Sequence, residues 1–147
     1  MDAAKQTEIL QKCDELKLLA LCIYGEARGE SELGKTAVGC VIRNRVNESK
    51  NKSYREIILK PMQFSCFNFN DSNLVILVKF AENNYILDES FNECMKVAKL
   101  IYENKVGDIT NKANHYFNPA KCNPYWIEKM SKTMTLGRHV FYRDEKK

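Results

Sequence analysis

The sequence lacks a long hydrophobic segment. Its longest apolar runs, 18–24 and 74–78, are far shorter than the roughly 20 residues that a helix needs to cross a bilayer. Charged side chains interrupt residues 1–15 throughout, so the pattern of a secretory signal peptide is also missing. We therefore expect synthesis in the cytoplasm and no transmembrane segment.

Proline, glycine, histidine and tryptophan are scarce, with 3, 6, 2 and 1 copies, while the hydrophobic share of 44% and the charged share of 29% are ordinary for a globular protein and do not indicate disorder. There is no C-x-x-C pair, and His115 and His139 lie near no carboxylate or thiolate at metal-ligand spacing. We therefore expect no metal and no cofactor. The 6 cysteines are widely spaced, and Cys22, Cys40 and Cys94 fall within apolar helical patterns. They are predicted to be mostly reduced core thiols, with the pairing of any two left open.

Charge of one sign does not dominate the chain, whose net charge is only +4. A mildly basic protein is attracted to polyanions, which include both bacterial walls and nucleic acids. Lysine and arginine alternate with acidic residues here, and no nucleic-acid-binding motif is present. We therefore expect no nucleic-acid partner.

The length of 147 residues suits a single domain, 1–147, with an N-terminal extension at 1–14 and a core from about 16 to 143. Apolar residues recur at helical spacing in several segments, and Ser31 is placed to cap one of them. For the last helix, either Asp88 or Ser90 is a candidate cap, and Ser90 with Glu93 has capping-box spacing. Helices are predicted at 14–28, 32–48, 54–60, 73–83 and about 88–104, with a loop at 62–71.

Beyond Gly107 the sequence becomes rich in short aromatic segments. Residues 114–118 and 139–143 are predicted to be two strands of a small sheet. The predicted fold class is therefore α+β, mostly α, with a small β element.

Glu26 stands at the C-terminal end of the helix predicted at 14–28, which is apolar on nearly all faces and so should be buried. Burial and the negative end of the helix dipole both raise the pKa of a carboxyl group there. A carboxyl that stays protonated near neutral pH can act as a general acid, for example on a glycosidic oxygen. The alternative is a structural glutamate that pairs with Arg28 or with solvent.

Several short motifs, in the same order, resemble those of the cell wall hydrolase family of spore cortex-lytic enzymes, and they cover nearly the whole chain. They begin with residues 24–30 (Tyr-Gly-Glu-Ala-Arg-Gly-Glu) and continue through Asn44-Arg45-Val46, Gln63-Phe64-Ser65-Cys66, His115-Tyr116-Phe117-Asn118-Pro119, Trp126 and the closing segment 136–143. One departure is Asp108-Ile109-Thr110-Asn111-Lys112, where the family commonly has Pro-Thr-Gly-Gly after the aspartate. The turn there is predicted to differ.

The resemblance implies a lysozyme-like fold related to lytic transglycosylases. It also implies cleavage of the bond between N-acetylmuramic acid and N-acetylglucosamine in peptidoglycan, during degradation of the spore cortex in germination. Glu26 would be the general acid and base that leaves 1,6-anhydro-muramic ends. Sugars are bound by aromatic faces, amides and hydroxyls. The residues expected to bind substrate are Tyr24, Arg28, Gln63, Phe64, Ser65, His115, Tyr116, Asn118 and Trp126.

Three alternatives stay open. One is a phage-type or bacterial muramidase on vegetative wall, in which Glu30 is a second acid. Another is a non-catalytic peptidoglycan-binding domain. The sequence also leaves open the ordinary core role of Tyr24, Phe64, Phe117 and Phe141. The protein would act at the spore cortex or coat, at the cell wall or after phage release, with peptidoglycan strands and an unidentified anchoring or regulatory protein as partners.

Overall fold

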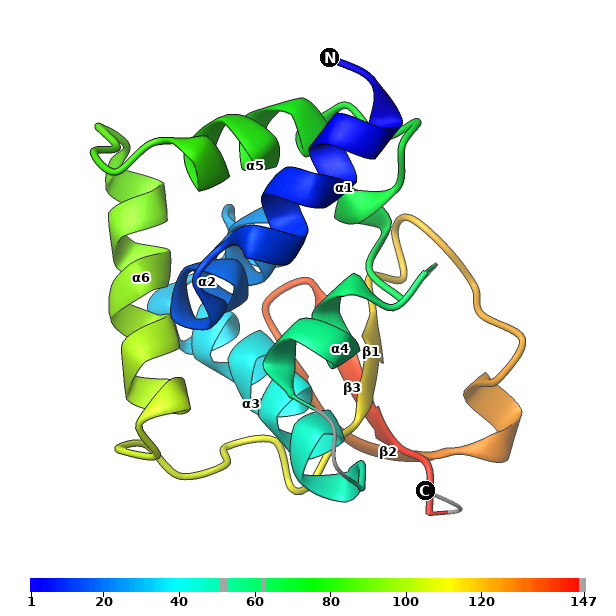
Figure 1. Cartoon of the computed structure of the whole chain (residues 1–147). Coiled ribbons are helices and arrows are strands. Elements are labelled where there is room, and N and C mark those ends of the chain that lie inside the picture. Colours follow the sequence, from blue (N-terminus) through cyan, green and yellow to red (C-terminus); the bar gives the residue numbers. More distant parts are fainter. Residues whose placement is uncertain (51–52, 62, 146–147) are drawn as a thin grey trace.

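The computed structural model describes residues 1–50, 53–61 and 63–145, and it shows a helical body with a small sheet along one side (Figure 1). The predicted α+β class with mostly helical content is confirmed. The helices are α1 (Ala3–Lys12), α2 (Glu15–Ala27), α3 (Glu32–Glu48), α4 (Tyr54–Leu59), α5 (Asn73–Glu82) and α6 (Glu89–Tyr102), with short 3-10 helices η1 (Ser65–Phe67) and η2 (Ile127–Lys129). The strands are β1 (His115–Phe117), β2 (Ser131–Leu136) and β3 (His139–Arg143).

Helix α2 forms the centre of the domain, as its apolar sequence predicts. Asp14 caps it by accepting a hydrogen bond from the Lys17 backbone N–H at 3.1 Å. Its residues 18–23 are completely buried, and it packs against α3, α4, α5 and α6. The helix ends at Ala27, so Glu26 lies in its last turn, where backbone carbonyls carry partial negative charge.

Helix α3 begins where the sequence predicts. The Ser31 hydroxyl accepts a hydrogen bond from the Gly34 backbone N–H at 3.1 Å, so Ser31 is the cap. Gly39 brings α3 close to α6, because a Cβ atom at this position would lie 2.9 Å from Ile101 Cγ1. Close packing of α2, α3 and α6 holds the last turn of α2 firmly in place.

Of the two candidate caps for helix α6, Asp88 and Ser90, the structure uses Asp88. Asp88 accepts the hydrogen bond from the Phe91 backbone N–H at 2.9 Å, while Ser90 lies inside the helix. The predicted Ser90–Glu93 capping box is therefore wrong. Glu93 instead forms an ion pair with the buried Lys35 of α3 at 2.6 Å.

The sheet has the order β1-β3-β2, and both pairings are antiparallel. Side chains alternate between its two faces, so Tyr116, His139 and Phe141 lie together on the face toward the helices. Phe141 is fully buried there in a small second core with Ala37 and Val41 of α3. The predicted strands at 114–118 and 139–143 are confirmed, but the sequence reading missed β2.

The sequence reading also missed α1, which lies within the segment treated as an N-terminal extension. This helix packs on α5, and Leu10 and Cys13 join the main hydrophobic core. In the part of the chain that the structure describes, no helix is long and apolar enough to cross a membrane. Met62, where the predicted loop begins, lies outside the described residues.

Candidate active site

Glu26 lies where three elements meet: the end of α2, the short helix η1 and strand β1. The Tyr116 hydroxyl of β1 donates a hydrogen bond to Glu26 Oε1. The Cys66 thiol of η1 also hydrogen bonds to the Glu26 side chain. The Glu26 carboxyl is thus half-buried and held by two side-chain donors from distant parts of the sequence.

The pKa of Glu26 is raised above the ordinary value of a glutamate. Burial is the largest cause, because it removes water from the charged form. The hydrogen bonds from Tyr116 and Cys66 and the positive charge of Arg45 oppose this effect, while the negative charge of Asp71 adds to it. Glu26 therefore keeps its proton to a higher pH than a solvated glutamate does, as a general acid requires.

Tyr116 stays neutral in this site. Its burial and the nearby Glu26 carboxylate raise the pKa of its hydroxyl far above the usual range. The Tyr116 ring contacts His139 edge-on, with 5.0 Å between ring centroids, and also contacts Phe141 at 5.8 Å. These contacts fix the ring and therefore the direction of the hydroxyl group toward Glu26.

Gly25 makes room for the thiol partner of Glu26. A Cβ atom on Gly25 would lie 2.6 Å from the Cys66 Sγ atom and 2.7 Å from its Cβ atom. Because real contacts are never that short, only glycine at this position allows Cys66 to approach the end of α2. The spacing of Gly25 and Glu26 in the sequence therefore has a direct structural use.

Arg45 of α3 is the cation nearest to the Glu26 carboxyl. Its Nε–H donates to the Asn114 carbonyl at 2.7 Å, and its guanidinium lies 5.3 Å from the centroid of the Phe64 ring. Its Nη1 atom is buried and has no hydrogen-bond partner among residues 1–50, 53–61 and 63–145. Arg45 and the exposed Gln63 line a polar cavity of about 420 Å³ together with Glu48 and two lysines, Lys50 and Lys60.

Glu30, the candidate second acid, is tied to the turn between β2 and β3. Its Oε1 atom accepts a hydrogen bond from the Arg138 backbone N–H at 3.0 Å, and its Oε2 atom lies 3.8 Å from Arg138 Nε. The Glu30 side chain is only 6% exposed. Gly137, at φ +60°, allows this contact, since a Cβ atom there would lie 2.3 Å from Glu30 Oε1. Glu30 thus fastens the α2–α3 connection to the sheet.

Two of the residues expected to bind substrate belong to a network inside the helical body. Tyr24 is only 4% exposed, its ring packs edge-on against Phe80 and Phe91, and its hydroxyl donates to Asp88 at 3.1 Å. Arg28 donates to the Tyr24 hydroxyl at 3.3 Å and to the Asn73 side chain. This corrects the expectation that Tyr24 offers a ring face to a sugar, and it favours the core interpretation.

Of the expected substrate-binding residues around η1, one lies in the core and two lie at the surface. Phe64 is only 3% exposed, so its ring lies in the core and not at a sugar-binding surface, which corrects a second expectation. Gln63 and Ser65 on either side are exposed. They remain available to a ligand near Glu26.

His115 and Trp126 lie on the opposite face of the sheet from Tyr116. Their ring centroids are 5.2 Å apart, and Trp126 also contacts Phe117 and Tyr142. Asn118 stabilises the turn after β1, where its Oδ1 atom accepts a hydrogen bond from the Ala120 backbone N–H at 2.9 Å. Because successive side chains of a strand point to opposite faces, His115 and the Trp126 ring that it contacts lie away from Tyr116 and the Glu26 carboxyl.

The sequence reading did not identify Cys66 and Arg45 as neighbours of Glu26, although both stood inside the quoted motifs. No spacing in the sequence predicts these contacts, since they depend on how η1 and α3 pack around α2. Among the described residues, no group of three or more histidine, cysteine, aspartate or glutamate side chains is arranged to hold a metal ion.

At residues 108–112 the sequence departs from the family pattern, yet the backbone still adopts the left-handed conformation that glycine favours. Asn111 and Lys112 both have positive φ angles, 55° and 67°. Asp108 holds the turn by accepting hydrogen bonds from the backbone N–H groups of Thr110 and Lys112, both at 2.8 Å. The turn therefore uses the left-handed conformation without its usual residue.

Solved structures with a similar fold include catalytic domains of SleB proteins. One is the catalytic domain of the germination-specific lytic transglycosylase SleB from Bacillus anthracis, with a TM-score of 0.65 and 27% identity over 88% of this chain and 93% of that one. The catalytic domain of the Bacillus cereus SleB protein is similar, with a TM-score of 0.63 and 28% identity over 88% and 89% of the two chains.

Sequence relatives carry matching names. Spore cortex-lytic enzymes of Bacillus cereus and Bacillus subtilis are 31% and 30% identical over 129 residues, or 87% of this chain. The chain spans less than half the length of these relatives, 44% and 37%. The model of the cell wall hydrolase family matches residues 29–142 and begins three residues after Glu26. Because this match covers most of the chain, the chain belongs to the cell wall hydrolase family.

Proposed function

We propose that this protein cleaves the glycan strands of peptidoglycan as a lytic transglycosylase, with Glu26 as the single acid and base. The observation that carries the proposal is the half-buried carboxyl of Glu26, with a raised pKa and hydrogen bonds from Tyr116 and Cys66, in a cell wall hydrolase. The names of the relatives support spore cortex as the substrate.

The reaction needs one carboxyl group for two proton transfers. Protonated Glu26 gives its proton to the glycosidic oxygen as the bond to the anomeric carbon of N-acetylmuramic acid breaks. The Glu26 carboxylate then takes the proton from the C6 hydroxyl of the same sugar, whose oxygen closes the 1,6-anhydro ring. The acetamido group can assist at the anomeric carbon, as in other substrate-assisted glycosidases. No water is consumed, and Glu26 ends protonated.

Tyr116, Cys66 and Arg45 would support the charged state of the Glu26 carboxyl, and burial would support its neutral state. Their hydrogen bonds and positive charge favour the anion that exists after the first proton transfer, while burial favours the acid that starts the reaction. This balance keeps Glu26 able to give and retake a proton at a higher pH than a solvated glutamate could.

The position of Glu30 supports the one-carboxyl mechanism over the two-acid muramidase. Its side chain is 6% exposed, and one of its oxygens accepts a hydrogen bond from the Arg138 backbone. A second acid must orient a water molecule beside the sugar, and a buried, bonded carboxylate is poorly suited to that task.

Wall cleavage by wild type and Glu26→Gln tests the proposal. We expect wild type to solubilise purified spore cortex and Glu26→Gln to be folded but inactive, because glutamine keeps the shape and loses the transferable proton. Glu103→Gln is the matched control, since Glu103 is exposed at the end of α6. A folded Glu26→Gln protein that still solubilises cortex would overturn the assignment. A wild type that binds cortex without cutting it would favour the non-catalytic binding domain.

A further inference from the structure

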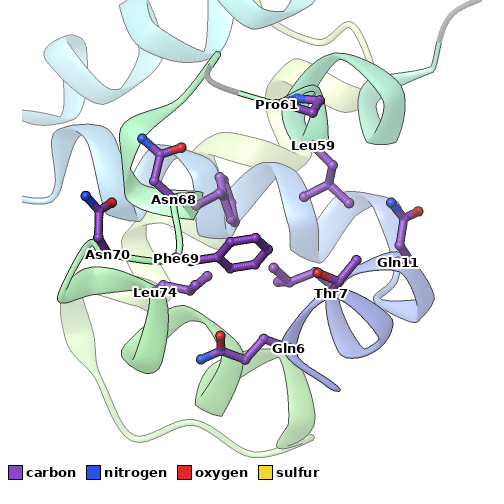
Figure 2. Close-up of a pocket in the computed structure, with 11 residues that line it drawn as sticks. Gln6, Thr7, Gln11, Leu59, Pro61, Asn68, Phe69, Asn70 and Leu74 are labelled. Atoms are coloured by element: carbon purple, nitrogen blue, oxygen red, sulfur yellow. The ribbon is translucent and has the colours of Figure 1, made fainter. Parts of the chain in front are cut away.

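A second cavity adjoins the segment that follows η1. It has a volume of about 630 Å³ and is enclosed by α1, the end of α4, the segment 67–70 and the start of α5 (Figure 2). Nothing in the proposed cleavage mechanism uses it. This volume is within the range of ordinary small-molecule sites.

The cavity combines an apolar floor with an exposed aromatic ring. Leu10 of α1 and Leu74 of α5 are buried and form part of the floor. Phe69 is 67% exposed, and Figure 2 shows its ring projecting from the loop toward α1, near Thr7. An exposed phenylalanine at the mouth of a cavity offers a flat apolar face, onto which the C–H face of a sugar ring can stack.

Four amide side chains line the same cavity. Gln6 and Gln11 come from α1, and Asn68 and Asn70 flank Phe69 (Figure 2). None of these four side chains has a hydrogen-bond partner among the described residues. Each amide offers both donors and an acceptor, the combination that sugar hydroxyl and acetamido groups need.

The lining carries no charged side chain, although 29% of the residues in the chain are charged. The cavity beside Arg45 is different, because Glu48, Lys50 and Lys60 line it. A ligand with a carboxylate or phosphate would gain nothing from the uncharged lining and would lose hydration there. The lining therefore fits a neutral polar ligand with an apolar face.

The cavity and Glu26 share one loop. Cys66 and Asp71, at the two ends of this loop, both affect the pKa of Glu26. Phe69 and Asn70, between them, line the cavity. Leu74 and Leu77 of α5 extend the connection, since Leu74 lines the cavity and Leu77 lies beside Gly25. A glycan held at the cavity would thus contact the same loop that carries Cys66 beside Glu26.

We propose that this cavity is a second carbohydrate site, which binds neutral N-acetylated sugars of a glycan chain. Phe69 stacks on the sugar ring, and the amides of Gln6 and Asn70 hydrogen bond to its hydroxyl and acetamido groups. The choice of an N-acetylated sugar rests on the proposed function, but binding at this site does not require cleavage. Its role is to hold the glycan while Glu26 cuts it.

Titration with chitotetraose, the tetramer of N-acetylglucosamine, tests this site. The Glu26→Gln protein is used so that binding is observed without turnover, and amide NMR shifts report where the ligand binds. We expect shifts in residues 6–11 and 67–70, and binding about three- to tenfold weaker in Glu26→Gln/Phe69→Ala. Tyr85→Ala in the same background is the matched control, because Tyr85 is 80% exposed and lies outside the cavity lining. Its affinity should not change.

Shifts confined to the surroundings of Glu26, or equal affinity with and without Phe69, would overturn the second site and leave the proposed cleavage intact. The opposite failure is also distinguishable. If wild type cuts no wall but chitotetraose still shifts residues 67–70, the proposed cleavage fails and the second site stands. A melting temperature equal to that of the parent would show that Phe69→Ala is folded, as expected for so exposed a side chain.

Discussion

The hydrogen bond from Tyr116 to Glu26 makes a quantitative prediction about the pH dependence of cleavage. Tyr116→Phe removes only the hydroxyl that donates to Glu26 Oε1 and leaves the ring in its contacts with His139 and Phe141. A hydrogen bond to a charged group contributes about 1.5–3 kcal/mol. Since 1.36 kcal/mol corresponds to one pKa unit, the pKa of Glu26 should rise by roughly one to two units.

The sign of the effect follows from the role of the proton. The hydrogen bond from Tyr116 favours the carboxylate and lowers the pKa of Glu26, so its loss favours the protonated form. The proposed reaction starts from protonated Glu26, and kcat/KM should therefore fall as pH rises through this pKa. In Tyr116→Phe the fall should occur about one pH unit or more higher than in wild type. The rate of cortex solubilisation across pH measures it.

Tyr102→Phe is the matched control for this experiment. The Tyr102 hydroxyl donates to Glu15 at 3.2 Å on the surface, so this variant also removes a tyrosine–glutamate hydrogen bond. Its pH profile should match that of wild type. A Tyr116→Phe profile that does not move, or that moves to lower pH, would refute the view that Glu26 is the group whose ionisation ends activity.

Four other substitutions should change the stability or test the cleavage products. The pKa of Glu26 is raised in the folded protein, so its ionisation lowers the stability as pH rises above the unfolded pKa of about 4.3. Glu26→Gln should therefore have a higher melting temperature than wild type at neutral pH and the same melting temperature below a pH of about 4.3. Melting curves across pH would measure the difference. Gly25→Ala should lower the free energy of unfolding by about 1–3 kcal/mol through its clash with Cys66, and Cys66→Gly in the same chain should recover part of it; no loss in denaturant titrations would contradict the packing. Glu30→Gln should lower the melting temperature yet still yield anhydro ends, whereas a folded, inactive variant would revive the two-acid mechanism. Lys112→Gly should raise the free energy of unfolding by up to about 1 kcal/mol, since it relieves a left-handed lysine; an unchanged or lower value would contradict this.

The helices that build the site could be predicted because their sequences contain both periodicity and caps. Helix α2 is apolar on all faces, and the Ser31 cap of α3 has its hydrogen bond where expected. Helix α1 has a cap, Asp2, but its apolar pattern is weak, since Leu10 is its only buried residue and Ile9 is only partly buried. Strand β2 is an edge strand whose side chains are mostly exposed or half-buried, so clear alternation is absent from its sequence.

The position of Glu26 could be predicted, whereas its partners could not. The sequence predicts a buried helix end, and burial is indeed the main cause of its raised pKa. The approach of Cys66 depends on the missing Cβ of Gly25, which would lie 2.6 Å from the Cys66 Sγ atom. The approach of Tyr116 depends on which face of β1 meets the helices. Aromatic type alone also does not distinguish a sugar-binding ring from a core ring, as the buried Tyr24 and Phe64 show.

The most direct test of the central claim is the mass of the cleavage products. Purified spore cortex is digested with wild type and with Glu26→Gln, and the soluble fragments are analysed by mass spectrometry. The account predicts 1,6-anhydro-muramic ends, one water lighter than hydrolysis products, from wild type and none from Glu26→Gln. Fragments with reducing muramic ends would contradict it, because they require water and an additional group to activate it.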